Sequence, residues 1–127
     1  MIPAYITSEM SNDFEEALQR GAEAGITTVH LRKGLFGKDI EQIGPEEIDR
    51  VKMTLEKFGM NIGVLMPPFG KCDIDNPDIV KAHHEIFARM VDIANAFDTR
   101  LIRSFPFTGV EPEEFDSHLN RIADTLR

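Results

Sequence analysis

The stretch that decides the fold lies in the first quarter of the chain and reads Gly25-Ile26-Thr27-Thr28-Val29-His30-Leu31-Arg32. Its glycine marks the end of a helical segment, because glycine adopts the left-handed backbone conformation at a helix C-terminus without steric cost. Residues 26–31 are rich in β-branched side chains and predict a strand. From Thr28 onward polar and apolar side chains alternate, so this strand has one polar face and one apolar face.

The same transition from helix to strand recurs along the chain. Short apolar runs predict four strands, at residues 4–7, 26–31, 61–66 and 100–105. Segments of helical period predict four helices, at residues 14–24, 45–58, 76–97 and 112–126. This alternation predicts a parallel sheet with right-handed crossovers. No linker or shift of composition interrupts it, so we expect one domain over residues 1–127.

Polar residues inside the predicted strands favour a barrel over an open sheet. The central strands of an open, doubly wound sheet read as continuous apolar runs, whereas His30 and Arg103 interrupt two of these strands. In a barrel, inward-facing side chains approach a polar mouth at the carboxyl ends of the strands. The chain has 127 residues, about half of the roughly 250 in a complete barrel. The prediction is an α/β fold, the parallel (βα)4 half of a TIM barrel.

Composition excludes several classes of protein. The chain carries 14 basic and 22 acidic residues, a net charge of −8 that disfavours binding to nucleic acid. No apolar stretch is long enough to span a membrane, and the N-terminus lacks the pattern of a signal peptide. The single cysteine, Cys72, has no partner for an internal disulfide, which favours a reducing compartment. We therefore expect a cytoplasmic protein.

Four segments together resemble the xylose isomerase-like (sugar phosphate isomerase/epimerase) TIM barrels. Residues 25–32 resemble the second strand of that family, with its pattern aGydgVELR, and residues 13–18 resemble its first helix. Residues 58–62 are similar to the handover from helix to strand in the third unit, and residues 101–107 to the fourth strand, lvRvFpf. The resemblance covers essentially the whole chain in the family's order.

The resemblance implies that the chain is the N-terminal half of a metal-dependent sugar isomerase or epimerase. Members of the family bind a divalent metal (Mn, Zn, Mg or Co) through Glu, Asp, His and Glu at the ends of the fifth to eighth strands. A carboxylate pair from that half moves protons between adjacent sugar carbons through an enediolate. We therefore expect substrate-side residues here, but neither catalytic residues nor metal ligands. His30 occupies the position where the family often has a glutamate, so the role of that carboxylate is not assigned to His30.

Three residues of the predicted strand ends are candidates for contact with a sugar or sugar phosphate. Arg32 can donate paired hydrogen bonds to a hydroxyl, carboxylate or phosphate, and His30 lies on the same strand face. Arg103 lies close to Phe105, an arrangement that suits stacking on a sugar ring. The alternatives are a buried ion pair for Arg32, a satisfied polar side chain for His30 and plain barrel packing for Phe105.

Two loops add further candidates, each with an ordinary alternative. The glycine-rich loop at residues 34–37 suits a lid that brings Phe36 over the ligand, or a plain surface loop. Lys71 lies in a second loop and suits contact with an anionic group. The adjacent His83 and His84 point about 100° apart on a helix, so they do not share one metal easily.

Two functions from different classes follow. The first is the substrate-side half of a sugar isomerase or epimerase. The alternative is a non-catalytic half-barrel that binds a ligand or pairs with a second copy, since two chains of 127 residues give 254 and an open sheet edge invites pairing. The DNA-repair endonucleases of the same superfamily are disfavoured, because Met66 and residues 103–107 occupy the strand ends where those enzymes have metal-binding histidines.

Overall fold

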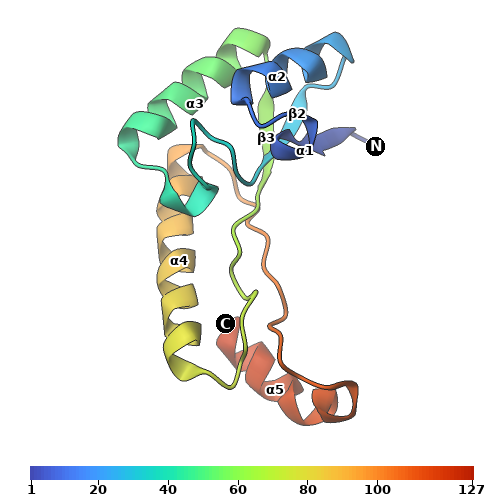
Figure 1. Ribbon diagram of the computed structural model, residues 1–127, viewed down its shortest axis with the longest axis vertical. Helices are drawn as coiled ribbons and strands as arrows, with labels where there is room; N and C mark the ends of the chain where they lie inside the picture. The colour runs from blue at the N-terminus through green and yellow to red at the C-terminus, as the bar shows by residue number, and fades with distance from the viewer. The chain divides into compact units, whose positions relative to one another are not determined.

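The computed structural model describes residues 1–127 (Figure 1). The chain divides into two compact units, of which the first comprises Met1–Pro67 and Arg89–Arg103 and the second comprises Pro68–Ala88 and Ser104–Arg127. Helix α4 (Pro77–Ala96) contributes residues to both units. None of the helices combines the length and the apolar character needed to cross a membrane.

The first unit contains a parallel sheet of three strands in the order β1-β2-β3. These strands are β1 (Ala4–Ile6), β2 (Thr28–Leu31) and β3 (Asn61–Leu65). The predicted α/β class and parallel pairing are therefore confirmed.

The fourth strand of the predicted (βα)4 unit, residues 100–105, is reduced to one parallel bridge. Ile102 pairs with Leu65, whose N–H donates to the carbonyl of Leu101 (2.9 Å). Leu101 exposes 60% of its surface, so burial does not hold the segment in the sheet. Pro106 has no N–H to extend the pairing. The predicted count of four strands is thus not confirmed.

Three α-helices accompany this sheet: α1 (Thr7–Met10), α2 (Phe14–Glu23) and α3 (Pro45–Phe58). Asp13 caps α2, because its Oδ1 accepts the N–H of Glu16 (2.8 Å). Gly59 ends α3 in the left-handed conformation, with φ of 64°. Figure 1 shows α2 and α3 side by side, and an ion pair between Glu15 and Lys57 joins them.

The helix-facing side of the sheet is apolar, and its Val29, Leu31 and Leu65 are fully buried. Tyr5 of β1 points toward α2, where its hydroxyl donates to the carbonyl of Ala17 (2.8 Å). The core of the unit consists mainly of Ala17, Leu18, Val29, Leu31, Leu35, Ile40, Val51, Leu65 and Met90. On the opposite face of the sheet, His30 lies between Ile6 of β1 and Val64 of β3.

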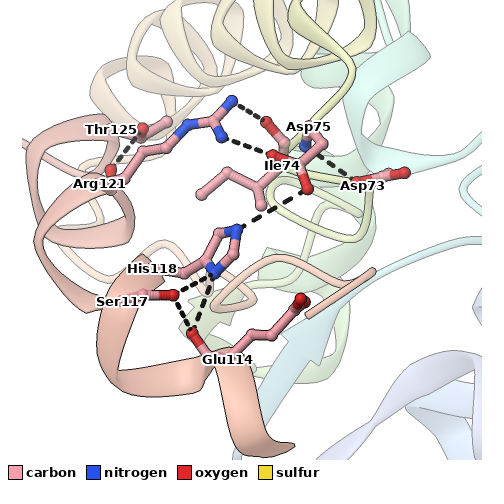
Figure 2. A network of polar contacts seen from close by, with 8 residues as sticks. All are labelled: Asp73, Ile74, Asp75, Glu114, Ser117, His118, Arg121 and Thr125. Carbon is pink, nitrogen blue, oxygen red and sulfur yellow. Dashed lines mark hydrogen bonds and ion pairs between the residues drawn. The ribbon is translucent and has the colours of Figure 1, made fainter. Parts of the chain in front are cut away.

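The second unit has a small core and one well-anchored helix. Its buried cluster is Cys72, Ile74, Phe107 and Ile122. The segment that begins at Pro112 opens as a short 3-10 turn, η2 (Pro112–Glu114), before α5 (Phe115–Thr125) starts. Figure 2 shows how the side chains of α5 reach back to the turn at residues 73–75.

Asp75 is the centre of that anchor. Its Oδ1 accepts from Arg121 Nη1 (2.5 Å), and its Oδ2 lies 3.7 Å from Nε2 of His118 (Figure 2). Arg121 Nη2 also donates to the carbonyl of Ile74 (2.7 Å). Side chains from two turns of α5 thus hold one short loop.

Candidate functional site at the strand ends

Strand β2 directs its polar residues away from the helices. Val29 and Leu31 are fully buried, whereas His30 is half-buried and lies on the other face. Arg32 follows in the same alternation, immediately after the strand. The predicted polar face therefore ends in an imidazole and a guanidinium at the carboxyl end of β2, the end at which active sites lie in this class of barrel.

A β-bulge sets the position of His30. Val29 pairs with Ile62 and His30 with Val64, so Gly63 is the extra residue of β3. A Cβ at residue 63 would lie 2.8 Å from Cε1 of His30. The imidazole thus packs directly over the glycine, and the bulge re-aims the strand beneath it.

Arg103 reaches the same strand ends from the neighbouring segment. Its N–H donates to the carbonyl of Leu65 (2.8 Å), and its Nη2 donates to the carbonyls of Met66 (3.3 Å) and Pro67 (3.1 Å). Burial lowers the pKa of Arg103 below its ordinary value, and the positive charge of Arg32 lowers it further. Met66, whose carbonyl accepts from Arg103, donates its own N–H to the carbonyl of Leu31 (2.8 Å), the residue before Arg32. Arg32 and Arg103 therefore lie at the same strand ends.

Glu9 of α1 supplies the negative charge at this site. Its Oε1 lies 2.5 Å from Nη2 of Arg32. The side chain of Arg32 is 30% exposed and that of Glu9 is 61% exposed, so water and ligands have access to the pair. Arg32 therefore forms an ion pair, but an accessible one and not the buried pair considered as the alternative.

Several polar atoms nearby are buried without a hydrogen-bond partner. They are Thr7 Oγ1, Ser8 Oγ, His30 Nδ1 and Arg32 Nε. Leaving a buried donor or acceptor unsatisfied costs free energy, so each such group calls for an explanation. His30 and Arg32 at the strand ends thus carry buried polar atoms whose hydrogen bonds no group of the protein supplies.

Phe36 has a different environment from His30, Arg32 and Arg103. It lies in a two-residue turn closed by paired backbone hydrogen bonds between Leu35 and Lys38 (2.9 and 3.2 Å), and its φ of 52° is unusual for a bulky residue. The guanidinium carbon of Arg50 lies 3.8 Å from the centroid of the Phe36 ring. The rings of Phe14 and Phe36 pack edge to face, with 5.6 Å between their centroids. Aromatic and cation–π contacts hold the turn in place.

The turn lines a pocket of about 320 Å³. Its lining residues are Asn12, Asp13, Phe14, Glu15, Gly34, Phe36, Gly37 and Arg50. His30, Arg32 and Arg103 are not among them. The structure does not bring Phe36 together with the strand-end residues.

Lys71 and Phe105 belong to the second unit. The ammonium group of Lys71 lies 5.9 Å from the ring centroid of Phe105, and the N–H of Phe105 donates to the carbonyl of Phe69 (2.9 Å). These two sequence candidates are thus near each other. Their role at the strand ends of the first unit stays a prediction.

The histidine pair of α4 has separate structural contacts. Nδ1 of His83 accepts the N–H of Gly70 (3.1 Å), and burial lowers the pKa of this imidazole. The rings of His84 and Phe69 pack edge to face, with 6.1 Å between their centroids. The two rings point to different partners, as their helical spacing predicts.

The donor set at the strand ends does not fit a divalent metal. A guanidinium has no lone pair for a metal ion, and only His30 and Glu9 among the residues here belong to ligand types. No group of three or more His, Cys, Asp or Glu side chains in the chain is placed to hold a metal ion. The chemistry of this site is therefore hydrogen bonding and charge.

Comparison with known proteins bears on the fold. No protein-family model and no curated protein sequence matches the chain. A xylose isomerase-like TIM barrel protein from Mycobacterium smegmatis, solved in complex with magnesium, matches 98% of this chain with a TM-score of 0.68 and 12% identity. The chain has the fold of half a xylose isomerase-like TIM barrel.

The half-barrel also matches a D-psicose 3-epimerase that was solved in the presence of D-fructose. The TM-score is 0.60 and the identity is 14%, over 98% of this chain. The match covers 48% of the first protein and 50% of the second, so the chain spans about half the length of each. The predicted resemblance is thereby confirmed at the level of the fold.

Glu9 is the residue of the half-barrel that sequence reasoning missed. It lies on α1, a four-residue helix that the apolar pattern does not predict. The available signal was its place three residues after β1, since the loop after one strand of a parallel sheet lies beside the end of the next strand. A carboxylate there is well placed to meet Arg32.

Proposed function

We propose that this half-barrel is the substrate-side half of a sugar isomerase or epimerase. The observation that carries the proposal is the convergence of Arg32 and Arg103, next to His30, at the carboxyl ends of parallel strands. The two solved structures compared above are each about twice as long as this chain, and one of them is an epimerase. The proposed ligand is a sugar or a sugar phosphate.

Each strand-end residue has a role suited to a polyhydroxylated ligand. The guanidiniums of Arg32 and Arg103 supply several N–H donors in fixed planar geometry. Glu9 supplies an acceptor for a hydroxyl proton, and Nδ1 of His30 is a buried ring nitrogen without a hydrogen-bond partner. Donors and acceptors together can orient a sugar, while none of these groups by itself moves a proton between adjacent carbons.

In this proposal the proton transfer and the divalent metal belong to a complementary half. That half would be contributed by other residues than these, because a second copy of this chain would bring neither the metal ligands nor the carboxylate pair. The open edge of β1, which pairs only with β2, is where an added strand would continue the sheet.

Calorimetric titration of the full chain with D-fructose and with D-fructose 6-phosphate tests the proposal. Arg32→Ala and Arg103→Ala each remove hydrogen-bond donors, and we expect roughly 10-fold or greater weakening of the ligand that binds. Arg20→Ala is the matched control, because Arg20 is exposed and pairs only with Glu16 one turn away on α2. Equal affinity in all three variants, or no binding of either ligand to the unmodified chain, contradicts the proposal.

A further inference from the structure

The contact between Glu9 and Arg32 has a consequence for ligand choice. A carboxylate oxygen already lies 2.5 Å from Nη2 of Arg32. Any anionic group that approaches this guanidinium therefore competes with the Glu9 carboxylate for its N–H donors. It also meets electrostatic repulsion from that carboxylate.

An uncharged sugar meets neither penalty. A hydroxyl group can donate to the carboxylate of Glu9 and can accept from Arg32, so it fits between a donor and an acceptor that are already paired. The pair is partly open, with 61% of the Glu9 side chain exposed, and a hydroxyl can reach both groups from solvent.

The ion pair also bears on the balance of charge at a site that holds a second guanidinium, that of Arg103. Arg32 and Arg103 are close enough that the charge of the first lowers the pKa of the second. The carboxylate of Glu9 pairs with Arg32, so the charge of that guanidinium is balanced without an anionic ligand. An external phosphate is one way to neutralise such a pair, and an internal carboxylate is another.

We infer that Glu9 is a specificity-determining residue that makes the strand-end site prefer an uncharged sugar to its phosphate ester. The inference rests on the proposed function and deepens it, because it selects between the two ligand classes that the proposal leaves open. The inference is based on the contact between Glu9 and Arg32 and on the accessibility of that pair.

The test compares Glu9→Gln with the unmodified chain, each titrated with D-fructose and with D-fructose 6-phosphate. Glutamine keeps the size of the side chain and removes its charge. We expect the affinity for the phosphate ester to rise about fivefold, in line with one close charge–charge contact in water. The affinity for D-fructose should stay within about twofold.

Two further variants complete the design. Glu9→Asp keeps the charge and should retain the preference for the uncharged sugar. Glu56→Gln makes the same change of charge on α3, next to Asn61 at the opposite end of β3, and should alter neither affinity. Raising the salt concentration should shrink the effect of Glu9→Gln, because salt screens exposed charges.

The outcomes separate this inference from the function on which it rests. A parallel loss of both affinities in Glu9→Gln would show that the carboxylate only positions Arg32, and an unchanged preference would show that it has no role in selection. Either result overturns the inference while the proposed function stands. Absence of binding of both ligands to the unmodified chain and to Glu9→Gln overturns the proposed function itself.

Discussion

The imidazole of His30 lies on the backbone of Gly63, close enough that a Cβ at residue 63 would come within 2.8 Å of Cε1 of the ring. The glycine is the extra residue of a bulge between β2 and β3. A packing requirement thus links the second strand to the third at the candidate site. The residue type at position 63 follows from the side chain at position 30.

Gly63→Ala should destabilise the first unit because the new methyl group collides with His30. We expect a loss of about 1–3 kcal/mol in the free energy of unfolding, as for other overpacked positions. Urea denaturation followed by circular dichroism measures it. The double variant His30→Ala/Gly63→Ala removes the collision and should recover part of the loss; purely additive effects would contradict this account of the bulge.

Tyr5→Phe should cost about 1 kcal/mol, the usual net value of one hydrogen bond. Its hydroxyl donates to the carbonyl of Ala17 (2.8 Å) and lies where a Cβ of Gly21 would be. Gly21→Ala should therefore be the more harmful change in thermal melts, since it displaces the whole ring. A larger loss for Tyr5→Phe than for Gly21→Ala would contradict the described packing of β1 on α2.

The stability of the first unit should fall at acid pH through Glu47. Its Oε1 accepts from Lys38 (2.6 Å) and its Oε2 from the N–H of Gly44 (2.8 Å), and these bonds lower the pKa of the carboxyl to about 2. A carboxyl whose pKa is lowered by folding stabilises the folded state above its ordinary pKa. That contribution is lost as the pH falls from about 4.5 toward 2.

Glu47→Gln provides the comparison, because an amide does not titrate. Urea midpoints measured between pH 6 and pH 2 should fall less steeply for this variant than for the unmodified chain. Identical slopes for the two proteins would show that the contacts of Glu47 with Lys38 and Gly44 do not persist in solution.

Cys72 should report on the core of the second unit. It is 7% exposed, and burial together with the neighbouring Asp73 raises the pKa of its thiol. Both effects lower the fraction of reactive thiolate, so a thiol-specific disulfide reagent should react slowly at pH 7 and rapidly in urea. Equally fast reaction under both conditions would mean that the cluster around Cys72 does not form.

Local signals in the sequence predicted much of the fold. The alternation in residues 25–32 predicted β2 and its polar face, and the helical periods at residues 14–24 and 45–58 predicted α2 and α3. Each of these features depends on a few neighbouring residues, which is why a linear pattern reveals it.

Features that depend on tertiary contacts were less predictable. The apolar run at residues 100–105 predicted a strand, yet Leu101 is exposed and only Ile102 bridges to β3. The bulge at Gly63 and the ion pair between Glu9 and Arg32 join residues from different strands or loops. Periodicity carries no information about such pairings, so Glu9 escaped notice while Arg32 did not.

The central claim is that a sugar binds at the ends of β2 and β3, and amide chemical shifts test it most directly. Titration of the ¹⁵N-labelled chain with D-fructose should shift the amide resonances of Glu9, Arg32 and Arg103, and leave those of Asn61 and Glu56 at the other end of the strands unchanged. Saturable shifts confined to the first group are the predicted result. Shifts confined to the pocket lined by Phe36 and Arg50, or no shifts at all, would contradict the claim.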